Sequence, residues 1–289
     1  MTINLGRDRL SVIMVAYLGE KISRVKDLFS RWREVPTFGY NDIREIEGRY
    51  RLHVRLAKTG FLLPLVHLNI PYPHEAALGW FDPNPEKNPQ LDEAATAEME
   101  KILKKLKPKV VVMTNSSKSE HFIREAVRSL PPGTELILLP SGDNEDEIKG
   151  RSREDANFVD YVPVTHVQKW MGYPKKMEDE QNYMTLEELK KAYPNSGDWV
   201  LVDDVYTTGK TIRAMEKVLG LGPKSRHNIA VIAVEKKFDG RYQKISLPKR
   251  LHAVFNLTEF TDLSRLNIDR SRLHVYDKLT IPPAIVKNE

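Results

Sequence analysis

Two adjacent carboxylates and a run of hydroxyl side chains form the part of this sequence best suited to chemistry. Asp203 and Asp204 are followed by Thr207 and Thr208 and then, after one glycine and one lysine, by Thr211. Carboxylate oxygens can accept hydrogen bonds from the vicinal hydroxyl groups of a sugar, whereas threonine hydroxyls and backbone N–H groups donate to phosphate oxygens. The spacing therefore suits a sugar that carries a phosphate.

The elements on either side of this run are predicted to position it. Trp199 to Val202 is an apolar, β-branched run, typical of a strand buried on both faces, and the carboxylates follow where that strand is expected to end. Ile212 to Leu219 has helical spacing and is followed by Gly220. A helix start presents unpaired N–H groups and the positive end of the helix dipole, and Gly209 allows the backbone to approach a phosphate closely.

Two simpler interpretations also fit parts of this stretch. Asp-Asp followed by Thr-Thr-Gly also suits an ordinary strand exit whose helix is capped by threonine, and this alternative stays open. The tripeptide Gly209-Lys210-Thr211 resembles the end of a Walker A phosphate loop. That motif needs a glycine five positions before Gly209, where this chain has Asp204, so the Walker interpretation is excluded.

The stretch from Val200 to Thr211, VLVDDVYTTGKT, resembles the phosphoribosyl-pyrophosphate (PRPP) motif of the type I phosphoribosyltransferases: an apolar strand, two acidic residues, then Thr-Thr-Gly-x-Thr. The resemblance implies a magnesium-dependent pentosyltransferase that moves 5-phosphoribosyl from PRPP to a ring nitrogen of a nucleobase or related heterocycle and releases pyrophosphate. The PRPP-binding residues that it implies are Asp203, Asp204, Val205, Tyr206, Thr207, Thr208, Gly209, Lys210 and Thr211.

A second hydroxyl-rich loop lies between the predicted strand Val110–Met113 and the predicted helix His121–Leu130. In the family, the corresponding loop binds the pyrophosphate leaving group. This assigns pyrophosphate binding to Asn115, Ser116, Ser117, Lys118 and Ser119. The same segment also fits a helix that is simply capped by serine or threonine, and both interpretations stay open.

The remaining site residues are implied by the family alone. A flap between the predicted strand Val159–Val164 and the PRPP strand closes over the reacting sugar, and Lys169, Lys175 or Lys176 would contact the pyrophosphate there. Lys169 joins Asp203 and Asp204 as a predicted catalytic residue, although an ordinary exposed basic loop is the alternative for the lysines. Mg²⁺ would contact Asp203 and Asp204 only indirectly. The acceptor base would stack on an aromatic ring near the last strands, with these candidates: Phe238, Phe255 and Phe260.

The composition is that of an ordinary globular chain. It has 289 residues, of which 40% are hydrophobic and 29% charged, and no cysteine, so disulfides and thiolate zinc sites are excluded. No apolar run reaches membrane-spanning length and the N-terminus lacks a signal-peptide profile, which leads us to expect a cytoplasmic protein without a membrane partner. The net charge of +5 fits a phosphate-rich substrate as well as nucleic acid.

From Leu91 to Leu257 predicted strands alternate with helices, which indicates an α/β fold: a mostly parallel, doubly wound sheet similar to the type I phosphoribosyltransferases. We expect an additional α+β lobe or hood over residues 1–85, a core over 91–260 and a tail over 261–289 that packs across the core or contacts another subunit. The proline-rich segment Asp82–Pro89 is the candidate linker.

A transferase acting on PRPP and a small heterocyclic acceptor is therefore the expected function, with a homodimer as the expected assembly. The alternative is a PRPP-sensing regulatory protein of the same fold, which binds nucleic acid or a protein partner. A further alternative is a PRPP-using enzyme with an unusual acceptor. Release of pyrophosphate in the presence of PRPP separates the enzymes from the regulator.

Overall fold

A computed structural model of the protein describes residues 35–68, 75–114, 120–139, 158–163, 182–222, 224–238, 248–261, 263–277 and 280–287. Thr37–Glu289 form one compact unit, which contains all of the elements below. Residues 1–34 of the predicted N-terminal lobe lie outside the described ranges. Within these ranges, no helix combines the length and the apolar character needed to cross a membrane.

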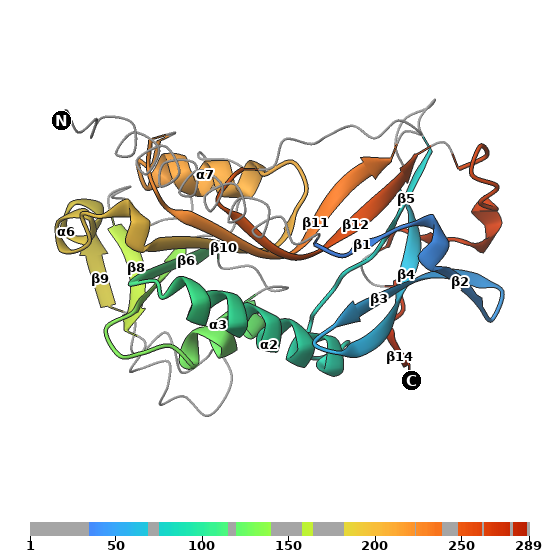
Figure 1. Cartoon of the computed structure of the whole chain (residues 1–289), viewed down its shortest axis with the longest axis horizontal. Coiled ribbons are helices and arrows are strands. Elements are labelled where there is room, and N and C mark those ends of the chain that lie inside the picture. Colours follow the sequence, from blue (N-terminus) through green and yellow to red (C-terminus); the bar gives the residue numbers. More distant parts are fainter. Residues whose placement is uncertain are drawn as a thin grey trace, which may run out of the picture. The chain divides into compact units, whose positions relative to one another are not determined.

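Five parallel strands form the centre of the sheet, so the predicted α/β fold with a mostly parallel core is confirmed (Figure 1). They are neighbours in the order β12-β11-β10-β6-β7. The apolar runs of β6, β7, β10 and β11 are buried on both faces, as expected of strands with helices above and below. Their bounds are β6 Val110–Thr114, β7 Glu135–Leu139, β10 Trp199–Tyr206, β11 Asn228–Phe238 and β12 Leu251–Thr261.

Antiparallel strands extend the sheet at both edges. β8 pairs with β7, and β9 pairs with β8. At the other edge β5 pairs with β12 and is followed outward by β4, β3 and β2. The N-terminal strands therefore continue the same sheet. Their bounds are β2 Ile43–Ile46, β3 Arg49–Leu56, β4 Thr59–Leu68, β5 Ala76–Gly79, β8 Phe158–Pro163 and β9 Asn182–Thr185.

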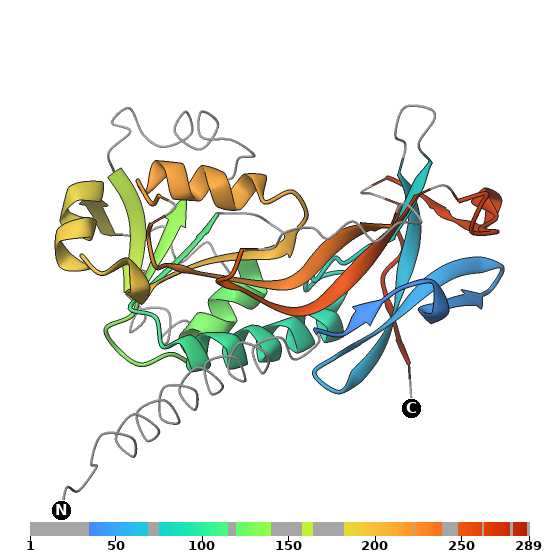
Figure 2. The ribbon, with the colours of Figure 1, turned by 45° about the horizontal axis from the view of Figure 1, so that its top comes forward.

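Helices cover both faces of the central strands (Figures 1 and 2). α2 (Pro89–Leu106) and α3 (Glu120–Arg128) pack in one apolar cluster, which includes Val200 and Val202 of β10. α6 (Leu186–Ala192) and α7 (Lys210–Val218) pack in the cluster on the other face, which includes Leu201. Successive side chains of a strand point to opposite faces, so one buried strand contributes to both clusters.

The C-terminal segment packs against the N-terminal strands. β13 (His274–Val275) and β14 (Ile285–Lys287) both pair with β4. The buried Arg51 donates from Nη1 to the carbonyl oxygens of Leu62 (3.2 Å) and Pro283 (3.0 Å). Burial lowers the pKa of Arg51 from its usual value, and these carbonyls compensate part of the lost hydration. The short elements are β1 Thr37–Phe38, η1 Tyr40–Asp42, η3 Ser196–Asp198 and η4 Arg270–Arg272.

The predicted linker Asp82–Pro89 joins β5 to α2. Its Asn88 is buried, donates from Nδ2 to the Asp82 carbonyl (2.8 Å) and accepts from the Ala284 N–H (2.8 Å). These contacts attach the segment to the C-terminal part of the chain. Whether the chain divides into the predicted lobe, core and tail stays a prediction.

The aromatic residues suggested for base stacking are part of the core. Phe255 and Phe260 are fully buried, and Phe255 makes edge-to-face contacts with Phe38 and Phe81, each with ring centroids 5.7 Å apart. A ring enclosed in this way offers no face to a ligand, so these two assignments are wrong. For Phe238, the last residue of β11, the structure describes the backbone but not the side chain.

We expect Phe255→Ala to lower the free energy of unfolding by about 3–5 kcal/mol, because it leaves a cavity among packed aromatic rings. Val275→Ala is the control, since this side chain is 76% exposed and its truncation should change stability by less than about 0.5 kcal/mol. Urea unfolding measures both. Equal effects of the two substitutions would contradict the packing described here.

Candidate functional site

The carboxylates lie in the last part of β10, where β10 pairs with only one of its two neighbouring strands. β10 pairs with β6 from Trp199 to Leu201 but with β11 as far as Tyr206. The prediction that the strand ends at Val202 is therefore wrong, because pairing with β11 alone extends it through the acidic pair. β6 itself continues to Thr114 beside β7, so β6 and β10 stop pairing before either strand ends.

At the same place, the connections that follow two neighbouring strands leave toward opposite faces of the sheet. The helix that follows β6, α3, lies on one face, and the helix that follows β10, α7, lies on the other. Open α/β sheets bind their ligands at such switch points, beyond the carboxyl ends of the strands. Both predicted phosphate loops leave the sheet here, although residues 115–119 themselves lie outside the described ranges.

Both carboxylates are half-buried and bonded to their own strand. Asp203 Oδ1 accepts from the Asp204 N–H (3.0 Å), and Asp204 Oδ1 accepts from the Val205 N–H (2.7 Å). A carboxylate has about four acceptor sites, and each of these bonds occupies one of them. The pair is neither enclosed in the apolar core nor fully exposed, as a site for sugar hydroxyls requires.

In three neighbouring strands, β10, β11 and β12, the regular alternation of side chains between the two faces of the sheet is displaced by one residue. The displacement occurs at positions that lie side by side in the sheet. In β10, Val202 packs with the α2 and α3 cluster, and so does Val205, although regular alternation would place Val205 on the opposite face. The same shift occurs at Ile232 and Ala233 in β11 and at Val254 and Phe255 in β12. As a result Val205 is anchored in the core and the next residue, Tyr206, turns toward α7.

The position of the Tyr206 ring explains why the loop has a glycine at position 209. Gly209 is buried with φ +70°, and a methyl group there would lie 2.4 Å from the Tyr206 Oη and 2.5 Å from Cζ. Only glycine satisfies both the left-handed backbone and the close ring. Burial raises the pKa of the Tyr206 hydroxyl above its usual value, an effect that the Arg213 charge partly opposes, so the hydroxyl remains a hydrogen-bond donor at neutral pH.

The loop and the start of α7 leave donors available for an anion. Thr207, Thr208 and Lys210 are exposed, and Thr211 is half-buried. Gly209 precedes α7 and has no side chain that could cap the helix, so the N-cap residue leaves the N–H groups of the first turn unbonded. Arg213 holds the loop by donating from Nη1 to the Thr208 carbonyl (2.8 Å).

Glu235 is a site residue that the sequence did not reveal. It follows Val234, the β11 partner of Tyr206, and its Oε2 accepts from the Thr207 Oγ1 (2.8 Å). In the sequence it belongs to the charged run Glu235-Lys236-Lys237, which carries no motif that would connect it with this loop. Its carboxylate adds a third acidic group near the loop. Among the residues with described positions, however, no three His, Asp or Glu side chains gather as a metal-binding group.

The predicted flap residues Lys169, Lys175 and Lys176 also lie outside the described ranges, as do Asn115, Ser116, Ser117, Lys118 and Ser119. The helix after that loop is fixed by an ion pair that the sequence analysis missed. His121 Nδ1 on α3 lies 2.8 Å from Oδ2 of the buried Asp92 on α2. The hydrogen bond to Asp92 raises the pKa of His121 above its usual value of 6.5.

Comparisons with known proteins give only distant similarities. No protein-family model and no curated protein matches the sequence. Among solved structures, a purine phosphoribosyltransferase from Pyrococcus horikoshii Ot3 is similar at 18% identity, covering 58% of this chain and 83% of that chain with a TM-score of 0.27. A hypothetical protein from Neisseria gonorrhoeae with bound ppGpp is 11% identical (67% and 89% covered, TM-score 0.32). A hypoxanthine phosphoribosyltransferase from Trypanosoma cruzi is 9% identical (57% and 76% covered, TM-score 0.26). At such TM-scores these similarities assign no role to any residue of this chain.

Substitution of Gly209 by alanine should separate backbone strain from contact with Tyr206. Gly48 has nearly the same φ, +72°, but a methyl group there meets nothing within 4 Å. We expect Gly48→Ala to cost about 1–2 kcal/mol from the left-handed backbone alone, and Gly209→Ala to cost more because Tyr206 must move. Urea unfolding of both variants tests this. A Gly209→Ala effect no larger than that of Gly48→Ala would contradict the contact.

The His121–Asp92 pair predicts a pH-dependent contribution to stability. Because the folded pKa of His121 is raised, its contribution is complete below pH 6.5 and is lost as the pH rises above 6.5 through the folded pKa. The difference in urea midpoint between the wild type and His121→Gln should therefore shrink with rising pH. Asp92→Asn should abolish the same dependence, and a difference that stays constant from pH 5.5 to 8.5 would refute the pairing.

Proposed function

We propose that this protein transfers a 5-phosphoribosyl group from PRPP to a ring nitrogen of a heterocyclic acceptor and releases pyrophosphate. The observation that carries the proposal is the position of the PRPP-like motif. Asp203 and Asp204 lie at the switch point between β6 and β10, and the uncapped start of α7 follows them. One site thus combines acceptors for a sugar and donors for a phosphate.

Each described residue would have a separate task. Asp203 and Asp204 would accept hydrogen bonds from the ribose hydroxyls, and their negative charge would favour the cation that develops as the bond at the anomeric carbon breaks. Thr207 to Thr211 and the first-turn N–H groups of α7 would hold the 5′-phosphate. Thr207 would exchange its bond to Glu235 for a phosphate oxygen, since one hydroxyl has a single proton to donate.

The pyrophosphate-binding part of the proposed site follows only from the resemblance of the sequence to the type I phosphoribosyltransferases. Residues 115–119 would bind the leaving pyrophosphate, and Lys169 would close over it from a flap that excludes water. The core would be doubly wound, with the N-terminal lobe near the acceptor, and the enzyme would act as a homodimer in nucleotide metabolism. These features extend the proposal beyond the residues discussed above.

Two neighbouring, half-exposed carboxylates fit a magnesium ion that takes most of its ligands from substrate oxygens and water, but not one held by the protein alone. Asp203 and Asp204 would then contact the ion indirectly. When bound, Mg²⁺ would supply positive charge to the pyrophosphate and ribose oxygens. The described part of the chain contributes the ribose contacts and the phosphate loop.

Replacement of both carboxylates by amides tests the ribose assignment. Asp203→Asn combined with Asp204→Asn should lower turnover at least about a hundredfold without unfolding the chain, because it removes both the charge and half of the acceptors. Pyrophosphate release from PRPP with Mg²⁺ and a panel of purines and pyrimidines is the measurement. Asp198→Asn, at the other end of β10, is the control and should retain activity.

Near-normal turnover of the double variant would refute the assignment. Binding of PRPP without pyrophosphate release across the whole panel, together with a salt-sensitive affinity for nucleic acid, would instead indicate the PRPP-sensing regulator.

A further inference from the structure

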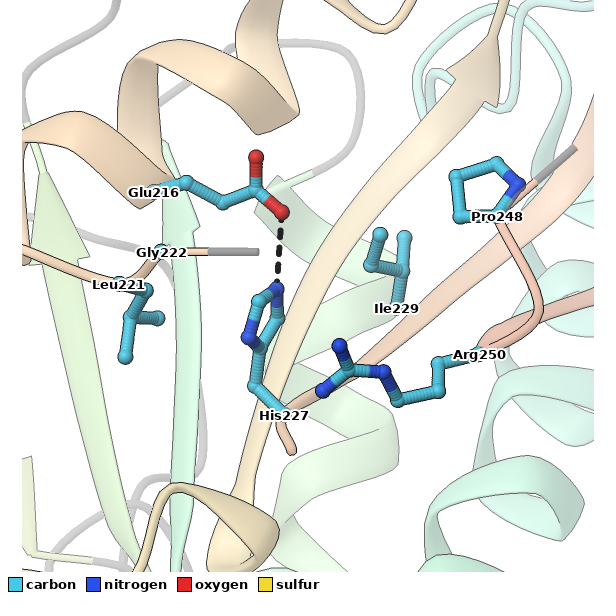
Figure 3. A pocket seen from close by; sticks show the side chains of 7 residues that line it. All are labelled: Glu216, Leu221, Gly222, His227, Ile229, Pro248 and Arg250. Atoms are coloured by element: carbon cyan, nitrogen blue, oxygen red, sulfur yellow. Dashed lines mark hydrogen bonds and ion pairs between the residues drawn. The ribbon is translucent and has the colours of Figure 1, made fainter. Parts of the chain in front are cut away.

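A small pocket lies at the opposite end of the sheet from the carboxylates (Figure 3). Its volume is about 150 Å³, and it is lined by Glu216, Leu221, Gly222, His227, Ile229, Pro248 and Arg250. Asn228 pairs with Val200 near the start of β10, whereas Val234 pairs with Tyr206 at its end. At about 3.3 Å per residue, roughly 20 Å of strand separates this pocket from the proposed PRPP site.

His227 presents an unused nitrogen in this pocket. The residue is only 3% exposed, and its Nε2 lies 2.9 Å from Glu216 Oε1. An ionised carboxylate only accepts hydrogen bonds, so Nε2 must carry a proton, and in the neutral ring Nδ1 is then an acceptor. This Nδ1 is buried and has no hydrogen-bond partner among the described residues.

Arg250 presents an unused donor in the same pocket. Its Nη1 is buried without a hydrogen-bond partner in the described part of the chain. Figure 3 shows the guanidinium extending from the start of β12 toward the imidazole, while Glu216 reaches the imidazole from α7. Buried polar groups are almost always hydrogen-bonded, so a buried acceptor and a buried donor without described partners in one pocket mark a place where a small polar group can bind.

The ligand must supply an acceptor for Arg250 and a donor for His227. A singly protonated phosphoryl group supplies both, as P–O⁻ and P–OH, whereas a carboxylate or a sulfate is only an acceptor at neutral pH. Glu216 keeps its negative charge, since the imidazole that donates to it is neutral in this arrangement, and the Arg250 guanidinium supplies the opposing positive charge in the pocket. Exposed cations lie close to the lining residues in the sequence: Lys224, Arg226 and Lys249.

We propose that this pocket binds a phosphoryl group, either as inorganic phosphate or as the end of a phosphate monoester. The P–O⁻ oxygens accept from Arg250, and the P–OH donates to His227 Nδ1. The small volume admits the phosphoryl group itself, and the remainder of an ester extends out of the pocket. The site is separate from the proposed PRPP site and does not depend on that function.

The long-range ¹H–¹⁵N spectrum of the histidine side chains tests the proposal at the site itself. The His227 signals are assigned by their loss in His227→Gln, and inorganic phosphate is the probe. We expect the Nδ1 signal to shift with saturation on phosphate addition, and sulfate to bind at least about fivefold more weakly because it has no proton to donate. Comparison with methyl phosphate identifies the source: tighter binding of the ester indicates a phosphorylated metabolite, and tighter binding of phosphate indicates the free ion.

Arg250→Gln and Lys249→Gln form a matched pair, since each removes one positive charge from adjacent positions but only Arg250 lines the pocket. Arg250→Gln should weaken phosphate binding at least about tenfold, as expected for a lost charge-assisted hydrogen bond, and Lys249→Gln less than about threefold. A urea midpoint close to that of the wild type shows that each variant is folded. An unshifted His227 signal, equal effects of the two substitutions, or equal binding of sulfate and phosphate would each overturn the proposal. None of these measurements uses PRPP, so failure here leaves the transferase proposal untouched.

Discussion

The candidate site depends on the separation of two neighbouring parallel strands. β6 and β10 share a ladder only as far as Leu201, after which β10 is held by β11 alone. Backbone groups that leave a ladder need other partners, and Asp203 and Asp204 supply them from their own side chains. The helices that follow the two strands lie on opposite faces, so both polar loops start beside the place where the strands separate.

The displaced side-chain alternation in β10, β11 and β12 explains why the motif has an apolar, an aromatic and a glycine residue at three of its positions. Val205 is apolar because the shift turns it into the core, and Tyr206 faces α7 because it is the next residue. The ring of Tyr206 leaves no room for a side chain at position 209. The start of α7 therefore follows a residue that cannot cap it, and the same glycine that fits the ring leaves the helix N–H groups open. One backbone irregularity thus links the apolar, aromatic and glycine positions.

Much of this arrangement could be predicted from the sequence, because buried parallel strands and amphipathic helices leave strong local patterns. The runs at Val110 and Trp199 and the helix after Thr211 were predicted at the right places. Strand length was underestimated, since β10 continues through polar residues while its backbone pairing with β11 persists. Pairing between distant segments, such as β5 with β12, has no local signal, so the continuity of the N-terminal strands with the sheet was missed. Phe255 illustrates the reverse error, because an aromatic residue near a strand end suits a core and a base-binding site equally.

The elements that contribute to both proposed sites are α7 and β11. Arg213 in the first turn of α7 holds the Thr208 carbonyl, and Glu216, one turn later, fixes His227. The charges of both Arg213 and Glu216 act on the Tyr206 hydroxyl, with opposite effects on its pKa. The short α7 helix therefore contributes to both ends of the sheet, because its first turn holds the loop over Gly209 and its next turn lines the pocket.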